Sequence, residues 1–283
     1  VEIQSKIDEI KENTFKRCQS LSKIIMPDSV VKIGKHAFEG CISLEEVDDE
    51  FLEQIEYIGE HAFEGCESLK RIIISSKITS VNEGVFIGCS KLNEITIPKS
   101  VTTIESNSFY LCKSLNKIKF ENPSSLISIK DRSFKKCKSL TEITIPHSVT
   151  VICSKVFKNC ISLEKVRIPS SVDEIGASTF EGCKKLIEIE MKAPISKIND
   201  KLFKGCTSLT EISIPDTVSE IGKKSFYQCC GLKKIILPRY LTKIETKAFF
   251  GCEQLEKVSI PKSVQYIGAD AFGQCSTLDF NFN

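Results

Sequence analysis

Residues 143–163 read ITIPHSVTVICSKVFKNCISL, and their spacing of apolar residues recurs along the whole chain. Each repeat carries an Ile or Val, then a Phe five residues later, a Cys three residues after the Phe and a Leu three residues after the Cys, and all four columns are filled twelve times. Nine of the eleven intervals between these Phe residues are 23 residues long and two are 25. The Phe column comprises Phe15, Phe38, Phe63, Phe86, Phe109, Phe134, Phe157, Phe180, Phe203, Phe226, Phe249 and Phe272. A period in the twenties is typical of a solenoid, in which each repeat forms one coil and buries its apolar side against its neighbours.

One repeat divides into three predicted pieces. Residues 140–145 end in an alternation of apolar and polar residues that Pro146 closes, which predicts a half-buried parallel strand. Residues 149–152 predict a second short extended piece, and residues 154–160 predict a short helical turn. Stacking of such coils predicts an α/β repeat solenoid of about twelve coils that forms a single domain over residues 1–283. The two longer intervals predict loop insertions at residues 48–55 and 121–129.

The repeat unit also carries a Pro and a Ser between its two extended pieces. The complete unit is Ile143-x-Ile145-Pro146-x-Ser148-Val149-x-x-Ile152-x(4)-Phe157-x-x-Cys160-x-Ser162-Leu163. Seven coils keep the proline, as Pro27, Pro98, Pro146, Pro169, Pro215, Pro238 and Pro261. This unit resembles the BspA-like class of leucine-rich repeats, and the resemblance covers essentially the whole chain. It implies a parallel sheet on the concave face, short extended or helical segments on the convex side, and a role in adhesion to host or matrix proteins.

The composition favours neither an anionic partner nor a membrane span. The chain has 39 Lys and Arg against 37 Asp and Glu, a net charge of +2, which gives no electrostatic argument for binding nucleic acid or an anionic membrane. No run of eighteen apolar residues occurs, and residues 1–11 show no signal-peptide pattern. We therefore expect no membrane span.

Twelve of the fourteen Cys residues belong to the repeated column. Stacked coils would bring their Cα atoms to about 4.8 Å, which a disulfide accepts, but a small apolar slot filled by free Cys explains the column more simply. The spacings match no short zinc-ligand pair, and His36, His61 and His147 are explained as surface residues, so we expect no metal and no cofactor. Free thiols and the lack of an Asn-x-Ser/Thr acceptor slightly favour a cytoplasmic location, whereas the family resemblance implies the cell surface.

A charged column lies two residues after the repeated Leu, beginning with Lys23 and Glu46. Neighbours in this column would be adjacent in a parallel sheet, so the alternation of charge predicts either an internally compensated ladder or a face that binds a partner of complementary charge. The alternation ends in an acidic patch of Glu188, Glu190 and Glu211. The predicted partner-binding residues on the concave face are Arg71, Glu94, Lys117, Glu142, Lys165, Arg167, Glu188, Glu190, Glu211, Lys234 and Lys257.

These patterns favour a non-enzymatic protein-interaction or adhesion module, because no catalytic or phosphate-binding motif is present. Its partner would be a host or matrix protein or an intracellular protein. The alternative is an intracellular scaffold or regulatory subunit, for example of a protein phosphatase, because Lys117-Ile118-Lys119-Phe120 resembles a phosphatase docking motif, although its Ile and Phe should be buried. Exposed strand edges at the solenoid ends predict that something caps them, and end-to-end self-association into a homo-oligomer is one route. Residues 278–282 depart from the repeat spacing by one residue and are either a cap or a truncation.

Overall fold

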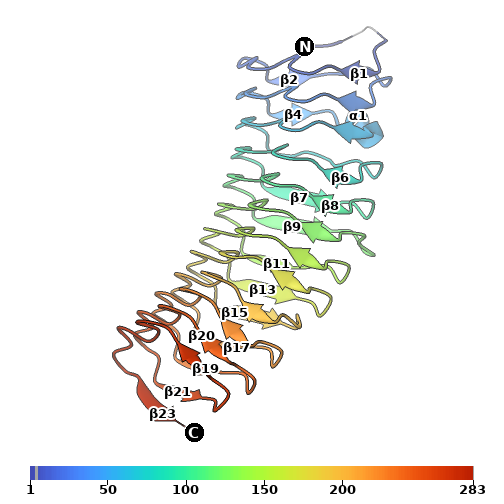
Figure 1. Cartoon of the computed structure of the whole chain (residues 1–283). Helices are drawn as coiled ribbons and strands as arrows, with labels where there is room; N and C mark the ends of the chain where they lie inside the picture. Colours follow the sequence, from blue (N-terminus) through green and yellow to red (C-terminus); the bar gives the residue numbers. More distant parts are fainter. Residues whose placement is uncertain (4–5, 283) are drawn as a thin grey trace. The chain divides into compact units, whose positions relative to one another are not determined.

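The chain folds into stacked coils of short parallel strands (Figure 1). The computed structural model describes residues 1–3 and 6–282. These residues form two compact units, Val1–Leu140 (unit 1) and Thr141–Asn283 (unit 2). Each unit is a parallel-strand β-solenoid with little helix. The predicted single domain and the concave placement of the sheet stay predictions.

The coils contribute to two kinds of sheet, which we name the major and minor sheets. In unit 1 the major strands are β2 (Lys23–Ile24), β4 (Glu46–Val47), β7 (Glu94–Ile97) and β9 (Lys117–Phe120). Its minor strands are β1 (Glu9–Ile10), β3 (Lys32–Ile33), β5 (Tyr57–Ile58), β6 (Ser80–Val81), β8 (Thr103–Ile104) and β10 (Ser128–Ile129). The major strands pair as β2–β4 and β7–β9, and the minor strands as β1–β3–β5 and β6–β8–β10, all parallel.

Unit 2 repeats this arrangement with longer major sheets. Its major strands are β11 (Glu142–Thr144), β13 (Lys165–Ile168), β15 (Glu188–Met191), β17 (Glu211–Ser213), β19 (Lys234–Ile236), β21 (Lys257–Ile260) and β23 (Asp279–Phe282). Its minor strands are β12 (Val151–Ile152), β14 (Glu174–Ile175), β16 (Lys197–Ile198), β18 (Glu220–Ile221), β20 (Lys243–Ile244) and β22 (Tyr266–Ile267). The two extended pieces predicted at residues 140–145 and 149–152 are confirmed by β11 and β12.

The number of complete coils is slightly lower than predicted. Among the described residues, twelve strands belong to the minor sheets and eleven to the major sheets, because residues 71–74 form no strand. About eleven coils therefore carry both strands. The irregular residues 278–282 do form a strand, since β23 pairs with β21 in register from Lys257↔Asp279 to Ile260↔Phe282.

The repeated Phe and Cys columns build the interior on the turn side of each coil. Within unit 2, the Phe180 ring stacks between Phe157 and Phe203, with centroid distances of 5.8 and 5.6 Å. The Phe180 carbonyl accepts a hydrogen bond from the backbone N–H of Cys183 (3.1 Å) and another from the Cys206 thiol of the next coil (3.2 Å). The Cys column is thus explained by more than side-chain size, because ten of its thiols donate to the Phe carbonyl of the preceding coil, which has a second lone pair to satisfy. Its predicted burial is confirmed for Cys41 through Cys252, whereas Cys18 is exposed.

The segment between the minor strand and the Cys is a series of turns rather than the predicted helix. Each coil has two residues with a left-handed backbone, two residues before and two residues after the Phe. In the coil of residues 154–160 these are Lys155 (φ 62°) and Asn159 (φ 61°). A right-handed helix requires φ near −60°, so no helix can pass through these positions. The turn backbones instead bond to the next coil, as when the Lys155 N–H donates to the Ala177 carbonyl (3.0 Å).

The Pro-x-Ser-Val corner links neighbouring coils through side chains. Within unit 2, the Val172 N–H donates to the Pro169 carbonyl (3.3 Å), which closes the turn, and the Ser171 hydroxyl donates to the carbonyl of Val149 in the preceding coil (2.8 Å). This second bond explains why a small hydroxyl residue follows the proline by two positions.

The first insertion folds as a helix and not as the loop that the sequence predicts. Helix α1 (Asp49–Gln54) begins after Asp48, whose carboxylate accepts the backbone N–H of Glu50 (2.9 Å) as a helix N-cap. Phe51 and Leu52 are buried, which fixes the helix against the interior. In the second insertion, residues 121–127 form no helix or strand, and the Asn122–Pro123 peptide bond is cis.

Candidate functional site

The predicted partner-binding residues all come from the major-sheet side of the coils. Apart from Arg71, which lies in the segment without a strand, each belongs to a major strand. The residues between them in the strands point inward, as the buried Ile143, Val166 and Ile212 show. We call the outward surface of the major strands and of residues 71–74 the sheet face. It is described separately for the two units.

In unit 2, ion pairs compensate the first part of the charged column. Lys165 is paired with Glu188 (Nζ to Oε2, 3.4 Å), and Arg167 with Glu190 (Nε to Oε2, 3.7 Å). A hydrogen bond from Lys192, at 2.9 Å, lowers the pKa of the Glu190 carboxyl. Two of the three carboxylates in the predicted acidic patch are therefore neutralised by neighbouring cations.

The second part of the column is less compensated. Lys234 lies opposite Glu211 on one side and opposite Lys257 on the other. Within the described residues, Glu211, Lys234 and Lys257 form no ion pair within 4.0 Å. Two like charges directly opposite each other in a sheet are destabilising. This part of the sheet face presents separated, accessible charges of both signs.

An exposed isoleucine stands among these charges. The Ile236 side chain, at the end of β19, is 64% exposed. It lines a hollow of about 340 Å³ together with Ile187, Glu188, Glu211 and Lys234, among other residues. It also lines a hollow of about 470 Å³ with Lys257, Ser259 and further residues of β19 and β21. Ile187 is 48% exposed, so the sheet face of unit 2 combines apolar and charged groups in one shallow surface.

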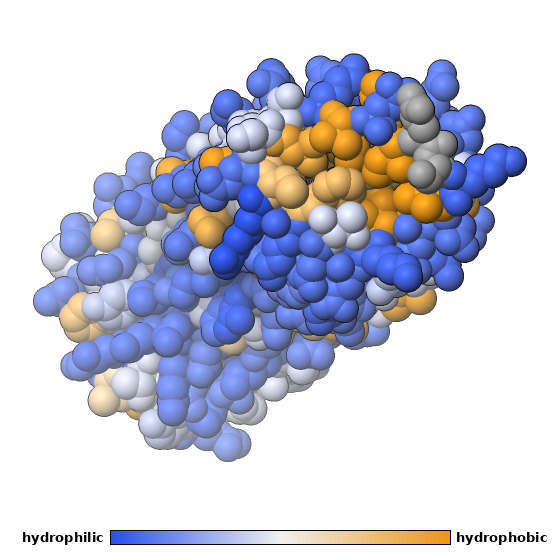
Figure 2. Space-filling view, turned by 90° about the horizontal axis from the view of Figure 1, so that it is seen from above, coloured by the Kyte–Doolittle hydropathy of each residue, from blue (hydrophilic) through white to orange (hydrophobic). Residues whose placement is uncertain are grey.

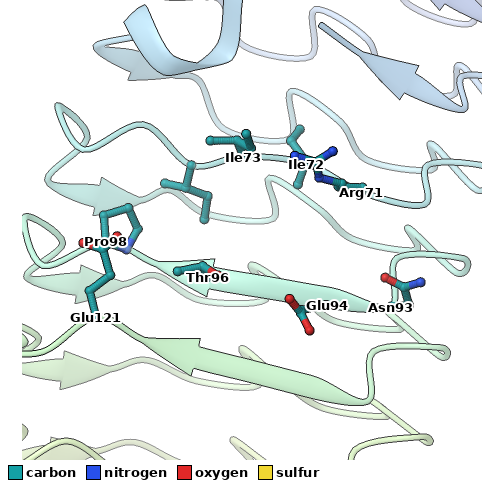
Figure 3. Close-up of a pocket in the computed structure, with 9 residues that line it drawn as sticks. Arg71, Ile72, Ile73, Asn93, Glu94, Thr96, Pro98 and Glu121 are labelled. Atoms are coloured by element: carbon teal, nitrogen blue, oxygen red, sulfur yellow. The ribbon is translucent and has the colours of Figure 1, made fainter. Parts of the chain in front are cut away.

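In unit 1 the sheet face contains a hollow of about 570 Å³ next to the segment that lacks a strand (Figure 3). Figure 3 shows Arg71, Ile72 and Ile73 on that segment, and Glu94 and Thr96 on the neighbouring β7. Pro98 and Glu121 line the far end. The hollow therefore opens where the regular ladder of the major sheet is interrupted.

At this interruption the coil is bonded to helix α1, which precedes it. Arg71 pairs with Asp49 at the start of α1 (Nη2 to Oδ2, 2.5 Å). Ser75, which stands where other coils have Pro, donates from its hydroxyl to the Glu53 carbonyl near the helix end (2.8 Å). Of the other predicted residues in unit 1, Glu94 is paired with Lys119 (2.6 Å) and Lys117 is exposed.

The segment that resembles a phosphatase docking motif is the strand β9 itself. Its residues pair in register with β7, from Glu94↔Lys117 to Ile97↔Phe120. Ile118 and Phe120 are half-buried, so their predicted burial is only partial. Because the strand is held in a sheet, it is not a free peptide available for docking.

Most thiols of the Cys column are buried, and two of the imidazoles lie beside glutamates. In the part of the chain that the structure describes, no group of three or more His, Cys, Asp or Glu side chains could hold a metal ion. Burial raises the pKa of the Cys41 thiol to about 11 and that of Cys229 to about 12, which makes these groups poor nucleophiles. The rings of His36 and His61 stack at 5.1 Å, and each ring lies within 2.7 Å of a glutamate, Glu39 or Glu64.

The first coil exposes apolar side chains on the end of unit 1 (Figure 2). Val1 is 67% exposed, and it lines a hollow of about 400 Å³ with Phe15, Cys18 and Leu21, among others. End-to-end self-association through such a surface stays a prediction. Among the described residues, no helix is both long enough and apolar enough to cross a bilayer.

Ile236 was not among the predicted partner-binding residues. The available signal was an apolar residue at an outward strand position, which Ile25 and Ile73 share. Only the register of β17 and β19 shows that Ile236 lies opposite Ser213, one outward position along the strands from the paired Glu211 and Lys234. The interruption at residues 71–74 had no sequence signal beyond the missing proline.

The comparisons with known proteins agree with this architecture. The profile of the family described as "BspA type Leucine rich repeat region (6 copies)" matches residues 1–116, 113–229 and 173–283. A leucine-rich repeat protein from Bacteroides ovatus is 27% identical with a TM-score of 0.78, and the match covers 98% of this chain and 88% of that one. A leucine-rich repeat protein from Eubacterium ventriosum is 24% identical with a TM-score of 0.67, covering 99% and 83%. A leucine-rich cell surface protein from Faecalibacterium prausnitzii is 25% identical with a TM-score of 0.50, covering 98% and 83%. The comparison with curated proteins gave no match.

Proposed function

This chain belongs to the BspA-type leucine-rich repeat family, and from that premise we propose that it is a non-enzymatic module that binds a protein partner through the sheet face. Leucine-rich repeat proteins generally mediate protein–protein interaction or adhesion. Extended repeat surfaces suit this role because they present many side chains on a rigid frame. The proposed binding residues are those of the charged column together with Ile236.

The exposure of Ile236 is the observation that carries this proposal. A large apolar side chain that is 64% exposed, with a hollow on either side, resembles the anchor of an interface more than a stable water-facing residue. The surrounding Glu211, Lys234 and Lys257 supply the polar rim that interfaces usually have. A partner would place an apolar side chain against Ile236 and charges of opposite sign against the rim.

A role in adhesion at the cell surface is the form of this proposal that the relatives support best. The F. prausnitzii protein is described as a cell surface protein, and a host or matrix protein would then be the partner. The alternative is an intracellular scaffold or regulatory subunit. Its support is the set of free thiols, which are typical of a reducing compartment. Counting free thiols after denaturation of protein from its native source distinguishes the two: fourteen reactive thiols favour the scaffold, and fewer favour the surface protein.

Substitution of Ile236 tests the binding face. The partner is first identified by capture on the intact chain from matrix and cytosolic extracts and is then purified. We expect Ile236→Ser to raise the Kd for this partner about 30-fold, because truncation of an interface anchor costs about 2 kcal/mol or more. Isothermal titration calorimetry measures the change.

Ile161→Ser is the matched control. Ile161 is also an exposed isoleucine of unit 2, at 38%, but it follows Cys160 and lies outside the major strands. Its substitution should leave the Kd unchanged, and both variants should keep the circular dichroism spectrum of the parent. Equal binding by parent and Ile236→Ser would show that the partner does not use this part of the sheet face.

A further inference from the structure

Unit 2 carries a row of lysines on the turn side of its coils. Lys201, Lys224 and Lys247 occupy the same position, two residues before the Phe, in three successive coils. The backbones of these turns are joined, since the Lys201 N–H donates to the Lys223 carbonyl (2.9 Å) and the Lys224 N–H to the Thr246 carbonyl (3.1 Å). The row therefore advances by about one strand spacing, about 4.8 Å, per lysine. We call Lys201, Lys204, Lys223, Lys224 and Lys247 the turn lysines.

The backbone at this position does not favour lysine. Lys201, Lys224 and Lys247 have φ values of 58°, 55° and 57°. The left-handed region costs a residue with a Cβ roughly 1–2 kcal/mol, and glycine avoids this cost, with Asn and Asp next best. Unit 1 fills the same position with Asn13, His36, His61, Gly84, Asn107 and Arg132. The other coils of unit 2 fill it with Lys155, Ser178 and Asp270, so the fold does not require lysine in three successive coils.

The charges of the turn lysines are only partly neutralised. Within the described residues, Lys201, Lys223 and Lys224 form no ion pair, whereas Lys204 pairs with Glu181 (3.4 Å) and Lys247 with Asp270 (3.7 Å). The acidic Asp200 of the same turns bonds to backbone. The Asp200 carboxylate accepts the backbone N–H of Lys223 (2.9 Å).

A stacked aromatic pair lies next to three of the turn lysines. The rings of Tyr227 and Phe250 stack at 5.2 Å, with Lys204 and Lys224 within 5.8 Å of the Tyr227 ring and Lys247 within 5.3 Å of the Phe250 ring. These cation–π contacts hold the lysines over the turns. One face of each ring is covered by the other ring, and lysine ammonium groups lie near both rings. A nucleobase would have to displace these lysines to stack on the pair.

We propose that the turn lysines form a binding site for a linear sulfated polysaccharide, separate from the sheet face. A lysine ammonium is a compact point charge with rotatable donors, which suits sulfate groups that vary in orientation along a sugar chain. The rigid coil repeat orders these charges in a row, so a linear polyanion can contact several of them at once. Recognition by charge without base stacking favours such a polymer over single-stranded nucleic acid.

Glycine substitution tests the site without endangering the fold. The variant Lys201→Gly, Lys224→Gly, Lys247→Gly removes three charges. It also relieves the backbone strain at three residues with a left-handed conformation. We expect it to bind heparin about tenfold more weakly than the parent in 0.15 M NaCl, because each lost ion contact weakens binding about two- to threefold. Its urea midpoint should be equal to or above that of the parent. Surface plasmon resonance on immobilised heparin gives the Kd.

The matched control removes three charges elsewhere in unit 2, as Lys192→Gln, Lys233→Gln, Lys262→Gln. It should bind heparin as the parent does, unsulfated heparosan should not bind the parent, and a single-stranded DNA of equal charge should bind more weakly than heparin. The proposal is overturned if the parent does not bind heparin, or if the control loses as much affinity as the glycine variant. Stronger binding of the DNA would overturn the assignment to a sulfated polysaccharide.

Discussion

The turn-side interior and the sheet face of unit 2 belong to the same coils, yet they differ in how strictly they repeat. Every interior Phe of unit 2 between Phe180 and Phe249 is fully buried and stacks on the Phe of each neighbouring coil at 5.1–5.8 Å. On the sheet face, the same strand position carries Glu211, Lys234 and Lys257 in three neighbouring coils, so the sign of the charge changes from one coil to the next. A change in the interior disturbs three coils at once, because each side chain there contacts two others. A change on the face alters mainly what the molecule presents to a partner.

Truncation of an interior ring should have the largest effect. We expect Phe180→Ala to lower the free energy of unfolding by about 3–5 kcal/mol, because it removes a fully buried ring from the stack and leaves a cavity. Urea unfolding followed by circular dichroism measures this loss. Phe250→Ala is the comparison, since Phe250 is half-buried and stacks on the single ring of Tyr227. A loss as large for Phe250 as for Phe180 would contradict the contrast between interior and surface.

Removal of a thiol of the Cys column should have the next largest effect. Cys206→Ala deletes a buried side chain and its hydrogen bond to the Phe180 carbonyl, and should cost about 1–2 kcal/mol. Cys230→Ala should cost less, because Cys230 is half-exposed and lies outside the column. Burial raises the pKa of the Cys206 thiol well above its ordinary value, so in the folded protein it should resist alkylation at pH 8. Rapid alkylation of Cys206 under native conditions would show that the interior is open to solvent.

Replacement of a left-handed residue should stabilise the turns. Gln228 has φ 56°, while Gly205 and Gly251 occupy the same position in the adjacent coils with φ 72° and 74°. We expect Gln228→Gly to raise the free energy of unfolding by about 1 kcal/mol. The reverse change, Gly205→Ala, should lower it by a similar amount, because an added Cβ there meets no atom closer than 3.9 Å and only the backbone is strained. Thermal denaturation compares the two variants, and effects of the same sign would refute the explanation.

The smallest effect should come from an ion pair on the turn side, and it should depend on pH. Burial acts to raise the pKa of Glu181, but hydrogen bonds from Lys158 and Ser178 and the charge of Lys204 lower it overall. A depressed folded-state pKa stabilises the fold above the unfolded pKa of about 4.3, and this contribution is lost as the pH falls through the folded pKa. We therefore expect Glu181→Gln to cost about 0.5–1 kcal/mol at pH 7 and nothing once the pH lies below the folded pKa.

Glu188→Gln is the control on the sheet face. The Glu188–Lys165 pair is half-exposed on both sides and 3.4 Å long, so its loss should change stability little at either pH. A pH-dependent loss equal to that of Glu181→Gln would mean that the sheet face contributes to stability as the turn side does. Urea midpoints at pH 7 and pH 3 decide between these outcomes.

Much of the fold could be predicted from the spacing of Phe157, Cys160 and Leu163 and their counterparts. Identical intervals require identical coils, and the alternation that ends at Pro146 required a strand at β11. The helical turn at residues 154–160 was predicted wrongly, because Lys155 and Asn159 do not show in the sequence that their backbones are left-handed. The hydrogen bonds that hold this conformation come from the next coil, 22 residues further along the chain. Helix α1 was likewise missed; besides its N-cap Asp48 it contacts Ser75 and Arg71 of the following coil, which the sequence does not show.

The sequence by itself determined the repeat, its period and the residues that fill the interior. It also identified the charged column, since position in a repeat implies position on a strand. Only the tertiary structure decided which charges are neutralised, that Ile236 lines two hollows, and that the row of turn lysines lies against the stacked rings of Tyr227 and Phe250. These properties depend on distances between side chains of neighbouring coils. A net charge of +2 hides such a row, because composition sums the charges that the coils separate onto different faces.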